Sequence, residues 1–116
     1  MTFGEAVEKY DGKEIDFKNS LARMCGNEQL YCKFLRKFID DSTYSDFCAA
    51  YAQKDTEQML HCAHTLKGLS GNLGLNKVYE HSAYIVQKLR KEEIDIDPQP
   101  LSEAYNEVIE IIKQLD

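Results

Sequence analysis

Apolar residues recur along most of this chain with the three- and four-residue spacing of amphipathic helices. No segment shows the strict two-residue alternation of a half-buried strand. The pattern therefore predicts an all-α protein. We expect helices over roughly residues 17–25, 28–53, 56–73, 76–91 and 98–115.

Residues with short polar side chains stand where these helices should begin. Asp16 and Asn27 can cap the first two helices, Asp55 or Thr56 the third, and Asn76 opens the fourth. Glycine suits the position just past a helix end, because it readily takes a left-handed backbone conformation. Gly26 and Gly74 stand at two such ends.

Short connections between long amphipathic helices favour antiparallel neighbours. We therefore expect a single domain over residues 1–116, folded as an up-down-up-down antiparallel four-helix bundle with a short accessory N-terminal helix. The segment 28–53 would form one long helix, with any bend around Ser42-Thr43. Residues 1–14 are ambiguous, since Phe3 and Val7 can pack a short extra helix but the segment can also be a frayed end.

Composition excludes several classes of function. The chain has 116 residues and a net charge of −6, and its Lys and Arg residues form only short helical clusters. Nucleic-acid binding is therefore not expected, because it needs a basic face that neutralises phosphates. No apolar run is long enough to span a bilayer and no signal peptide is visible after Met1, so we expect no membrane insertion.

The cysteines Cys25, Cys32, Cys48 and Cys62 are widely spaced and form no CxxC pair. Because three of them lie in helical patterns, we expect reduced, mostly buried thiols and a cytoplasmic protein. A monomer is the default expectation for its oligomeric state.

Helix 56–73 carries the most distinctive chemistry of the chain. It holds a histidine, a lysine one turn later and several glycines, although glycine destabilises a helix interior by about 0.5–1 kcal/mol relative to alanine. At about 100° per residue, its apolar stripe faces the core and His64 lies almost opposite, with Lys67, Gly68 and Gly71 close by. The pattern predicts a projecting histidine on a flattened surface.

Each of these residues also has an ordinary structural explanation. A lone surface histidine usually has no function, Lys67 alone is a solvated lysine, and Gly68 or Gly71 alone can serve the close packing of another helix. Both glycines lie away from the predicted core, however, and all four residues share one face. This coincidence favours a functional site, whereas His61 and His81 are expected to be ordinary polar or partly buried residues.

His64-Thr65-Leu66-Lys67-Gly68, followed by Asn72 and Gly74, resembles the signature of histidine-containing phosphotransfer domains. The upstream residues Ile15-Asp16-Phe17 and Gly26-Asn27-Glu28-Gln29-Leu30-Tyr31 resemble the entry of such domains. The resemblance implies a four-helix bundle with an accessory helix, in agreement with the independent helix count. It also implies a phosphorelay carrier, which exchanges a phosphoryl group with the aspartate of a receiver domain and has no kinase activity of its own.

The resemblance assigns roles to individual residues. His64 would be the phospho-acceptor, since an exposed imidazole is mostly neutral and nucleophilic near neutral pH. Lys67 would offset the phosphoryl charge, and Gly68 and Gly71 would let the loops of the receiver approach closely. The receiver supplies Mg²⁺ in this family, so no cofactor or metal is expected in this chain.

The residue that orients the imidazole stays open. Many family members carry a glutamine or glutamate on the following helix for this purpose, but Val86 stands at that position. Gln87, Ser82 or a backbone carbonyl would orient the ring of His64, or nothing in the chain does.

The docking patch for the receiver is expected around His64. It would include Leu60, Gly68, Gly71 and Leu75, extended by the short helix near Met24. The partner would be a response-regulator receiver domain or the receiver domain of a hybrid sensor histidine kinase. The interface should be small and weak, because a carrier must release its partner after each transfer.

Two functions of other classes are alternatives. One is a receiver-binding module without phosphotransfer, which usually lacks the histidine or the lysine. The other is a metal-binding helical bundle that uses His61, Cys62 and His64, although Cys62 points elsewhere on the helix and no carboxylate completes the set. No nucleotide-binding glycine loop and no catalytic triad are present, so we expect no autonomous enzyme.

Overall fold

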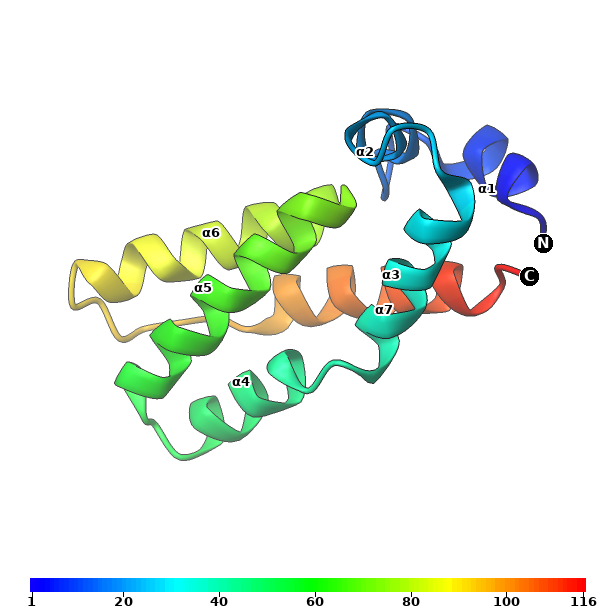
Figure 1. Cartoon of the computed structure of the whole chain (residues 1–116). Helices are drawn as coiled ribbons and strands as arrows, with labels where there is room; N and C mark the ends of the chain where they lie inside the picture. The colour runs from blue at the N-terminus through cyan, green and yellow to red at the C-terminus, as the bar shows by residue number, and fades with distance from the viewer.

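The computed structural model describes all residues 1–116, which form seven helices and no strand. The helices are α1 (Phe3–Tyr10), α2 (Phe17–Arg23), α3 (Glu28–Asp40), α4 (Thr43–Ala52), α5 (Thr56–Leu73), α6 (Asn76–Arg90) and α7 (Gln99–Lys113) (Figure 1). The prediction of an all-α protein is confirmed. None of these helices combines the length and the apolar character needed to cross a bilayer.

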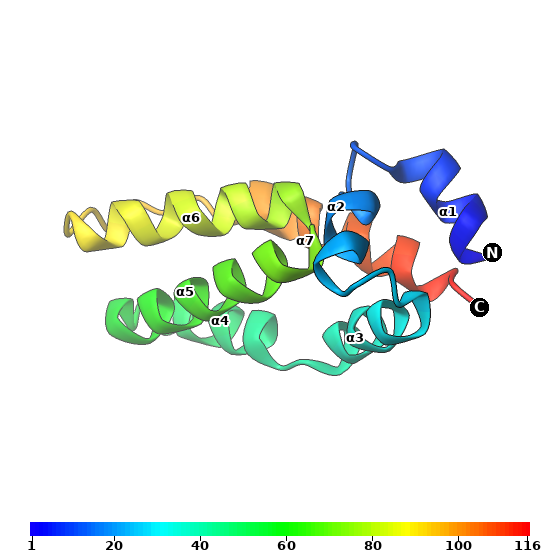
Figure 2. The same ribbon diagram turned by 45° about the horizontal axis from the view of Figure 1, so that its top comes forward.

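The helices pack side by side into an elongated bundle of 42 × 21 × 20 Å. α5 lies between α4 and α6, and α7 packs against α6 and α3 (Figures 1 and 2). The short helices α1 and α2 lie at one end of the bundle, where the two chain termini also meet (Figure 2). There the Met1 ammonium donates a hydrogen bond of 2.7 Å to the Gln114 carbonyl oxygen.

Local capping bonds set most helix starts where the sequence predicts them. The side chains of Asp16, Asn27 and Asp55 accept hydrogen bonds from backbone N–H groups in the first turns of α2, α3 and α5, at 3.2, 3.0 and 3.1 Å. Such bonds satisfy N–H groups that have no partner within the helix. These predictions depend only on neighbouring residues and are confirmed.

The expected long helix over residues 28–53 is wrong, because the chain breaks it into α3 and α4. Asp41 adopts an extended backbone with φ −74° and ψ 131°, which no α-helix accommodates. Its carboxylate accepts a hydrogen bond of 2.8 Å from the N–H of Thr43, the first residue of α4. The break therefore lies where a bend was expected, and a side chain that competes for backbone hydrogen bonds stabilises it.

The N-terminal segment is a helix and not a frayed end. Thr2 and Glu5 form reciprocal capping bonds at the start of α1, and those bonds lower the pKa of Glu5. The ring of Phe3 then packs edge-on against Phe17 and Tyr31, with ring centres 5.6 and 6.0 Å apart. α1 is thus held to the bundle by an aromatic cluster.

Two of the four cysteines are buried and two are exposed, which corrects the expectation that most are buried. Cys32 and Cys62 lie in the core, whereas Cys25 and Cys48 are exposed, and all four are free thiols. Cys25 lies in the turn after α2 with a positive φ of 56°, and Cys48 lies on the outer side of α4. Burial raises the pKa of the Cys32 and Cys62 thiols.

Candidate functional site

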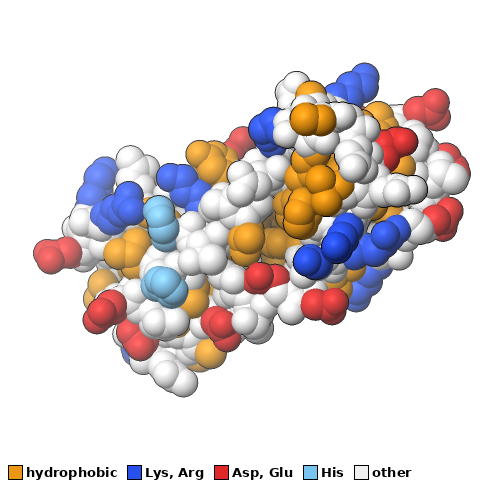
Figure 3. All heavy atoms as spheres, viewed as in Figure 1, with side chains coloured by type: hydrophobic (Ala, Val, Ile, Leu, Met, Phe, Trp, Pro, Cys, Tyr) orange, Lys and Arg blue, Asp and Glu red, His pale blue; other side chains and the backbone are white.

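The periodicity of α5 places His64 on its outer face. The residues of this helix that are buried are spaced at three and four positions, as an apolar stripe requires. They are Met59, Cys62, Ala63, Leu66, Ser70 and Leu73. His64 is exposed and lies away from that stripe, as the helical phase predicts. Histidine side chains are visible on the molecular surface in Figure 3.

The structure gives the imidazole of His64 no hydrogen-bond partner. Its ring makes no hydrogen bond in the structure, and neither does the exposed Gln87 side chain. Ser82 is fully buried and its hydroxyl oxygen has no hydrogen-bond partner, so it does not bond the ring either. Val86 is 2% exposed and packs in the core instead of reaching the surface. No hydrogen bond in the structure therefore fixes the ring of His64.

Gly68 and Gly71 lie one turn apart but have different surroundings. A Cβ atom added at Gly68 would meet nothing within 4 Å, so this position is open, as the sequence predicts. A Cβ atom at Gly71 would lie 3.2 and 3.3 Å from Cδ2 and Cε2 of Tyr79. The expectation that Gly71 belongs to a bare landing surface is thus wrong, because the Tyr79 ring from α6 packs over it.

Lys67 is half-buried on the side of His64 that faces α6. Its Nζ lies 5.9 Å from the centre of the Tyr79 ring, within the range of a cation–π contact. It takes part in none of the four salt bridges of the chain and donates no hydrogen bond. The ammonium therefore has no anionic partner in the free protein.

The two leucines of the predicted docking patch differ in accessibility. Leu60 is partly buried against the core, with part of its side chain left at the surface. Leu75 is fully buried at 0% exposure, so it cannot belong to a docking surface. It follows the left-handed Gly74, and the chain reversal there turns its side chain into the core.

The C-terminal end of α5 is anchored from two directions. Gly74 ends the helix with a φ of 76°, as predicted, and its carbonyl oxygen accepts a hydrogen bond of 2.8 Å from the Asp16 N–H. The Arg23 guanidinium donates to the carbonyl oxygens of Gly71 and Asn72 at 3.1 and 3.3 Å. A cation at the C-terminus of a helix also interacts favourably with its dipole. These bonds fix α2 beside the end of α5.

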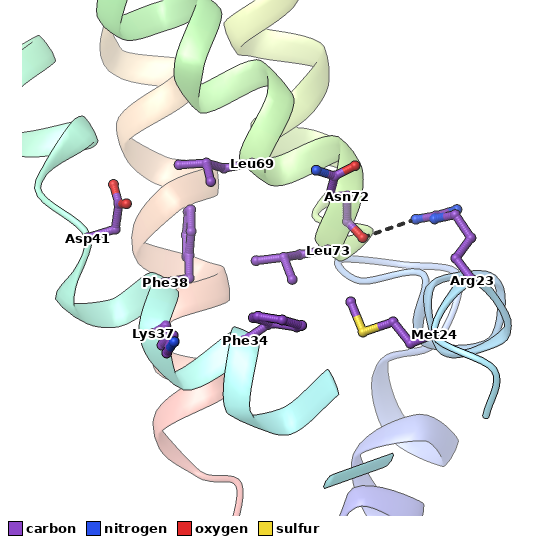
Figure 4. Close-up of a pocket in the computed structure, with 9 residues that line it drawn as sticks. All are labelled: Arg23, Met24, Phe34, Lys37, Phe38, Asp41, Leu69, Asn72 and Leu73. Carbon is purple, nitrogen blue, oxygen red and sulfur yellow. Dashed lines mark hydrogen bonds between the residues drawn. The ribbon is translucent and has the colours of Figure 1, made fainter. Parts of the chain in front are cut away.

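A groove with apolar walls lies between α2, α3 and α5 (Figure 4). Its walls come from Met24, Phe34, Phe38, Leu69 and Leu73, and its rim from Arg23, Lys37, Asp41 and Asn72. Apolar side chains form a patch over α2 and α3 on the same face of the molecule as the histidines (Figure 3). Of these residues, the sequence predicts only Met24 as part of the docking surface. The spacing of Phe34 and Phe38 signals an apolar helix side but does not show that the side stays partly uncovered.

The arrangement of His61, Cys62 and His64 gives the metal-binding alternative no support. Cys62 is buried in the core, whereas both histidines are exposed, so the three side chains do not converge on one point. Within residues 1–116, no three His, Cys, Asp or Glu side chains lie close enough together to hold a metal ion.

Sequence reasoning also missed Tyr79 and Arg23. Neither stands in the segment 63–74, and both reach that segment from another helix. A tyrosine in the first turn of α6 carries no sequence signal of its own. Only the packing of α6 against α5 brings its ring to Gly71 and Lys67.

Comparison with known protein families identifies the Hpt domain over residues 33–116, which is more than two thirds of the chain. Comparisons with curated proteins and with solved structures returned no match. Hpt domains serve histidine phosphotransfer in phosphorelays, where they are phosphocarriers and not kinases and interact with receiver domains. With the exposed histidine and the helical architecture described above, this chain belongs to the Hpt domain family.

Proposed function

We propose that His64 carries the phosphoryl group of a phosphorelay. The neutral ring attacks the phosphorus of a phosphoaspartate through the lone pair of Nε2. A P–N bond forms while the P–O bond to the aspartate breaks, and the aspartate leaves as a carboxylate. The reverse exchange returns the group to a second receiver. The exposure of His64 beside the open position of Gly68 is the observation that carries this proposal.

Lys67 is the residue of this chain that offsets the phosphoryl charge. It stands one turn after His64 on an adjoining part of the helix face, and no carboxylate competes for its ammonium. Phosphoryl transfer depends mainly on positioning and on neutralising the charge of the transferred group. The receiver supplies the Mg²⁺ and its acidic pocket, so the chain itself uses no cofactor.

The partner is a receiver domain, either of a response regulator or of a hybrid sensor histidine kinase. It would contact Gly68 directly above the helix backbone and the exposed part of Leu60. The apolar groove with Met24, Phe34 and Leu69 extends this surface on the side away from α6. A transient interface of this kind can remain small, as weak signalling encounters do.

The scaffold of this function is an antiparallel four-helix bundle in which α3 and α4 together take the place of the first helix. The other three helices of the bundle are α5, α6 and α7, and α1 and α2 are accessory helices. We propose that the carrier works as a monomer.

The decisive experiment offers a phosphorylated receiver domain to the wild type, to His64→Gln and to His61→Gln. His61 is the matched control, since it is exposed on the same helix one turn earlier. We expect acid-labile, alkali-stable label on the wild type and on His61→Gln, and none on His64→Gln. Label on all three proteins would show that another residue is the acceptor.

Two further measurements on the same proteins, co-elution with the receiver and titration with Zn²⁺, separate the two alternatives. A receiver-binding module would co-elute with the receiver but carry no label in any variant. A metal-binding bundle would bind Zn²⁺ in a titration of the wild type and lose it in His61→Gln. Neither outcome is expected.

A further inference from the structure

Tyr79 of α6 contacts the outer face of α5, the face that carries His64. Tyr79 lies in the first turn of α6, and the edge of its ring packs on the backbone of α5 at Gly71. The residue is 41% exposed, so its ring is also part of the molecular surface. The ring is held in place by α5 on one side and open to solvent on the other.

The same ring faces the ammonium of Lys67, with Nζ 5.9 Å from its centre. Lys67 precedes Gly71 by one turn, so the ring spans the two positions along α5. Within residues 1–116, no salt bridge or hydrogen bond competes for this ammonium. The π-face of Tyr79 is therefore the one attractive contact that the structure gives this ammonium.

We propose that Tyr79 is a positioning residue that holds Lys67 ready beside His64 for phosphotransfer, an inference that rests on the proposed function of His64. The ring attracts the ammonium through its quadrupole but leaves the positive charge unneutralised. When a phosphoryl group arrives on His64, the ammonium can leave the ring for the stronger charge-assisted contact with phosphoryl oxygens. A carboxylate at the same place would compete with the phosphoryl group for the lysine.

The proposal also explains why a glycine occupies position 71. Any side chain there would meet the Tyr79 ring and push it away from α5. Gly71 thus acts through the ring and the lysine, whereas Gly68 leaves space for the partner.

The first test measures the contact itself and does not depend on phosphotransfer. The methylene protons of Lys67 next to Nζ should show an upfield NMR shift from the ring current in the wild type. Tyr79→Phe should retain this shift and Tyr79→Leu should lose it. Tyr84→Leu is the matched control. It removes another ring of α6, whose centre lies 5.6 Å from Nζ of Lys88. A Lys67 shift that is unchanged in Tyr79→Leu would overturn the proposal.

The second test measures the transfer rate from a phosphorylated receiver domain that labels the wild-type chain. Tyr79→Leu should slow transfer about threefold, the size expected for a partly exposed cation–π contact. Tyr79→Phe should restore the rate, and Tyr84→Leu should leave it unchanged. In a Lys67→Ala background, Tyr79→Leu should cause no further loss, because the ring acts only through the lysine.

Three results distinguish a loss of folding, a failure of the Tyr79 proposal and a failure of the His64 assignment. Thermal unfolding of each variant shows whether a slow rate comes from lost folding. A wild-type rate in Tyr79→Leu, or an equal loss with and without Lys67, would refute the role of Tyr79 while His64 remains the acceptor. Label on His64→Gln would instead refute the proposed function and leave the NMR result standing.

Discussion

The outer face of α5, which carries His64, has two flanks, and they differ in which side chains cover them. On the flank toward α6, the Tyr79 ring packs over Gly71 and faces Lys67. On the flank toward α2 and α3, Gly68 is open and the surface continues into the apolar groove. The covered flank can hold a charged side chain in place, and the open flank can receive another protein. Two glycines one turn apart thus have different roles, because a side chain of a neighbouring helix packs over Gly71 and none packs over Gly68.

The largest effect is expected from closing the open flank with Gly68→Leu. A leucine side chain there would meet no neighbour in the free protein, and it favours the helix more than glycine does. It would, however, hold the receiver away from His64, and a displacement of this order should lower the transfer rate at least about tenfold. Stopped-flow or rapid-quench transfer measures the rate, and thermal unfolding should show no loss of stability. An unchanged rate would mean that the partner does not approach over Gly68.

The next effect concerns the groove, and Phe34→Asp tests it. Phe34 is 38% exposed in the groove wall, so a charge there should weaken receiver binding about fivefold, as the loss of an aromatic interface anchor does. Tyr84→Asp is the control, since Tyr84 is an exposed aromatic residue of α6 outside this groove. Titration calorimetry measures the affinity. Equal losses in both variants would show that surface charge and not the groove determines binding.

A smaller effect should appear as protection of Cys25 from alkylation. Cys25 is exposed next to Met24 of the groove, whereas Cys48 is exposed on α4. Receiver binding should slow the alkylation of Cys25 and leave that of Cys48 unchanged. Cys32 and Cys62 should react slowly throughout, because burial raises their pKa and reduces the reactive thiolate. Mass spectrometry of the four peptides measures the rates, and equal protection of Cys48 would place the interface elsewhere.

The smallest effect is expected on the covered flank, from Gly71→Ala. The added methyl group must displace the Tyr79 ring by a few tenths of an ångström, which weakens its contact with Lys67. Transfer should slow by no more than about twofold, since only part of a modest cation–π contact is lost. The same substitution in a Tyr79→Leu background is the control, because no ring is left there for the methyl group to displace. An equal slowing by Gly71→Ala with and without the Tyr79 ring would show that the methyl group acts by direct contact with the partner.

Most helix boundaries follow from the sequence because they depend on residues close together in the chain. Asp16, Asn27 and Asp55 cap helices through bonds to N–H groups three positions away. Gly74 ends α5 through its own backbone conformation. The break between α3 and α4 was harder to predict, because the apolar pattern continues through a segment in which Asp41 interrupts the backbone bonds.

The site was predictable only as far as one helix determines it. The 3.6-residue period placed His64 outward and the apolar stripe of α5 inward, since a helix fixes the direction of its own side chains. Burial of Leu75 and Val86 depends on how the chain turns after α5 and how α6 packs. The sequence does not determine the environment of these two residues, because that environment comes from distant segments.

The sequence by itself determined an outward histidine, a lysine one turn later and an open glycine, all properties of a single helix. The tertiary structure decided that Tyr79 covers Gly71 and faces Lys67, and that an apolar groove flanks the other side. The physical reason is that helical periodicity fixes only which way a residue points. What meets it there is set by the packing of other helices around the same core.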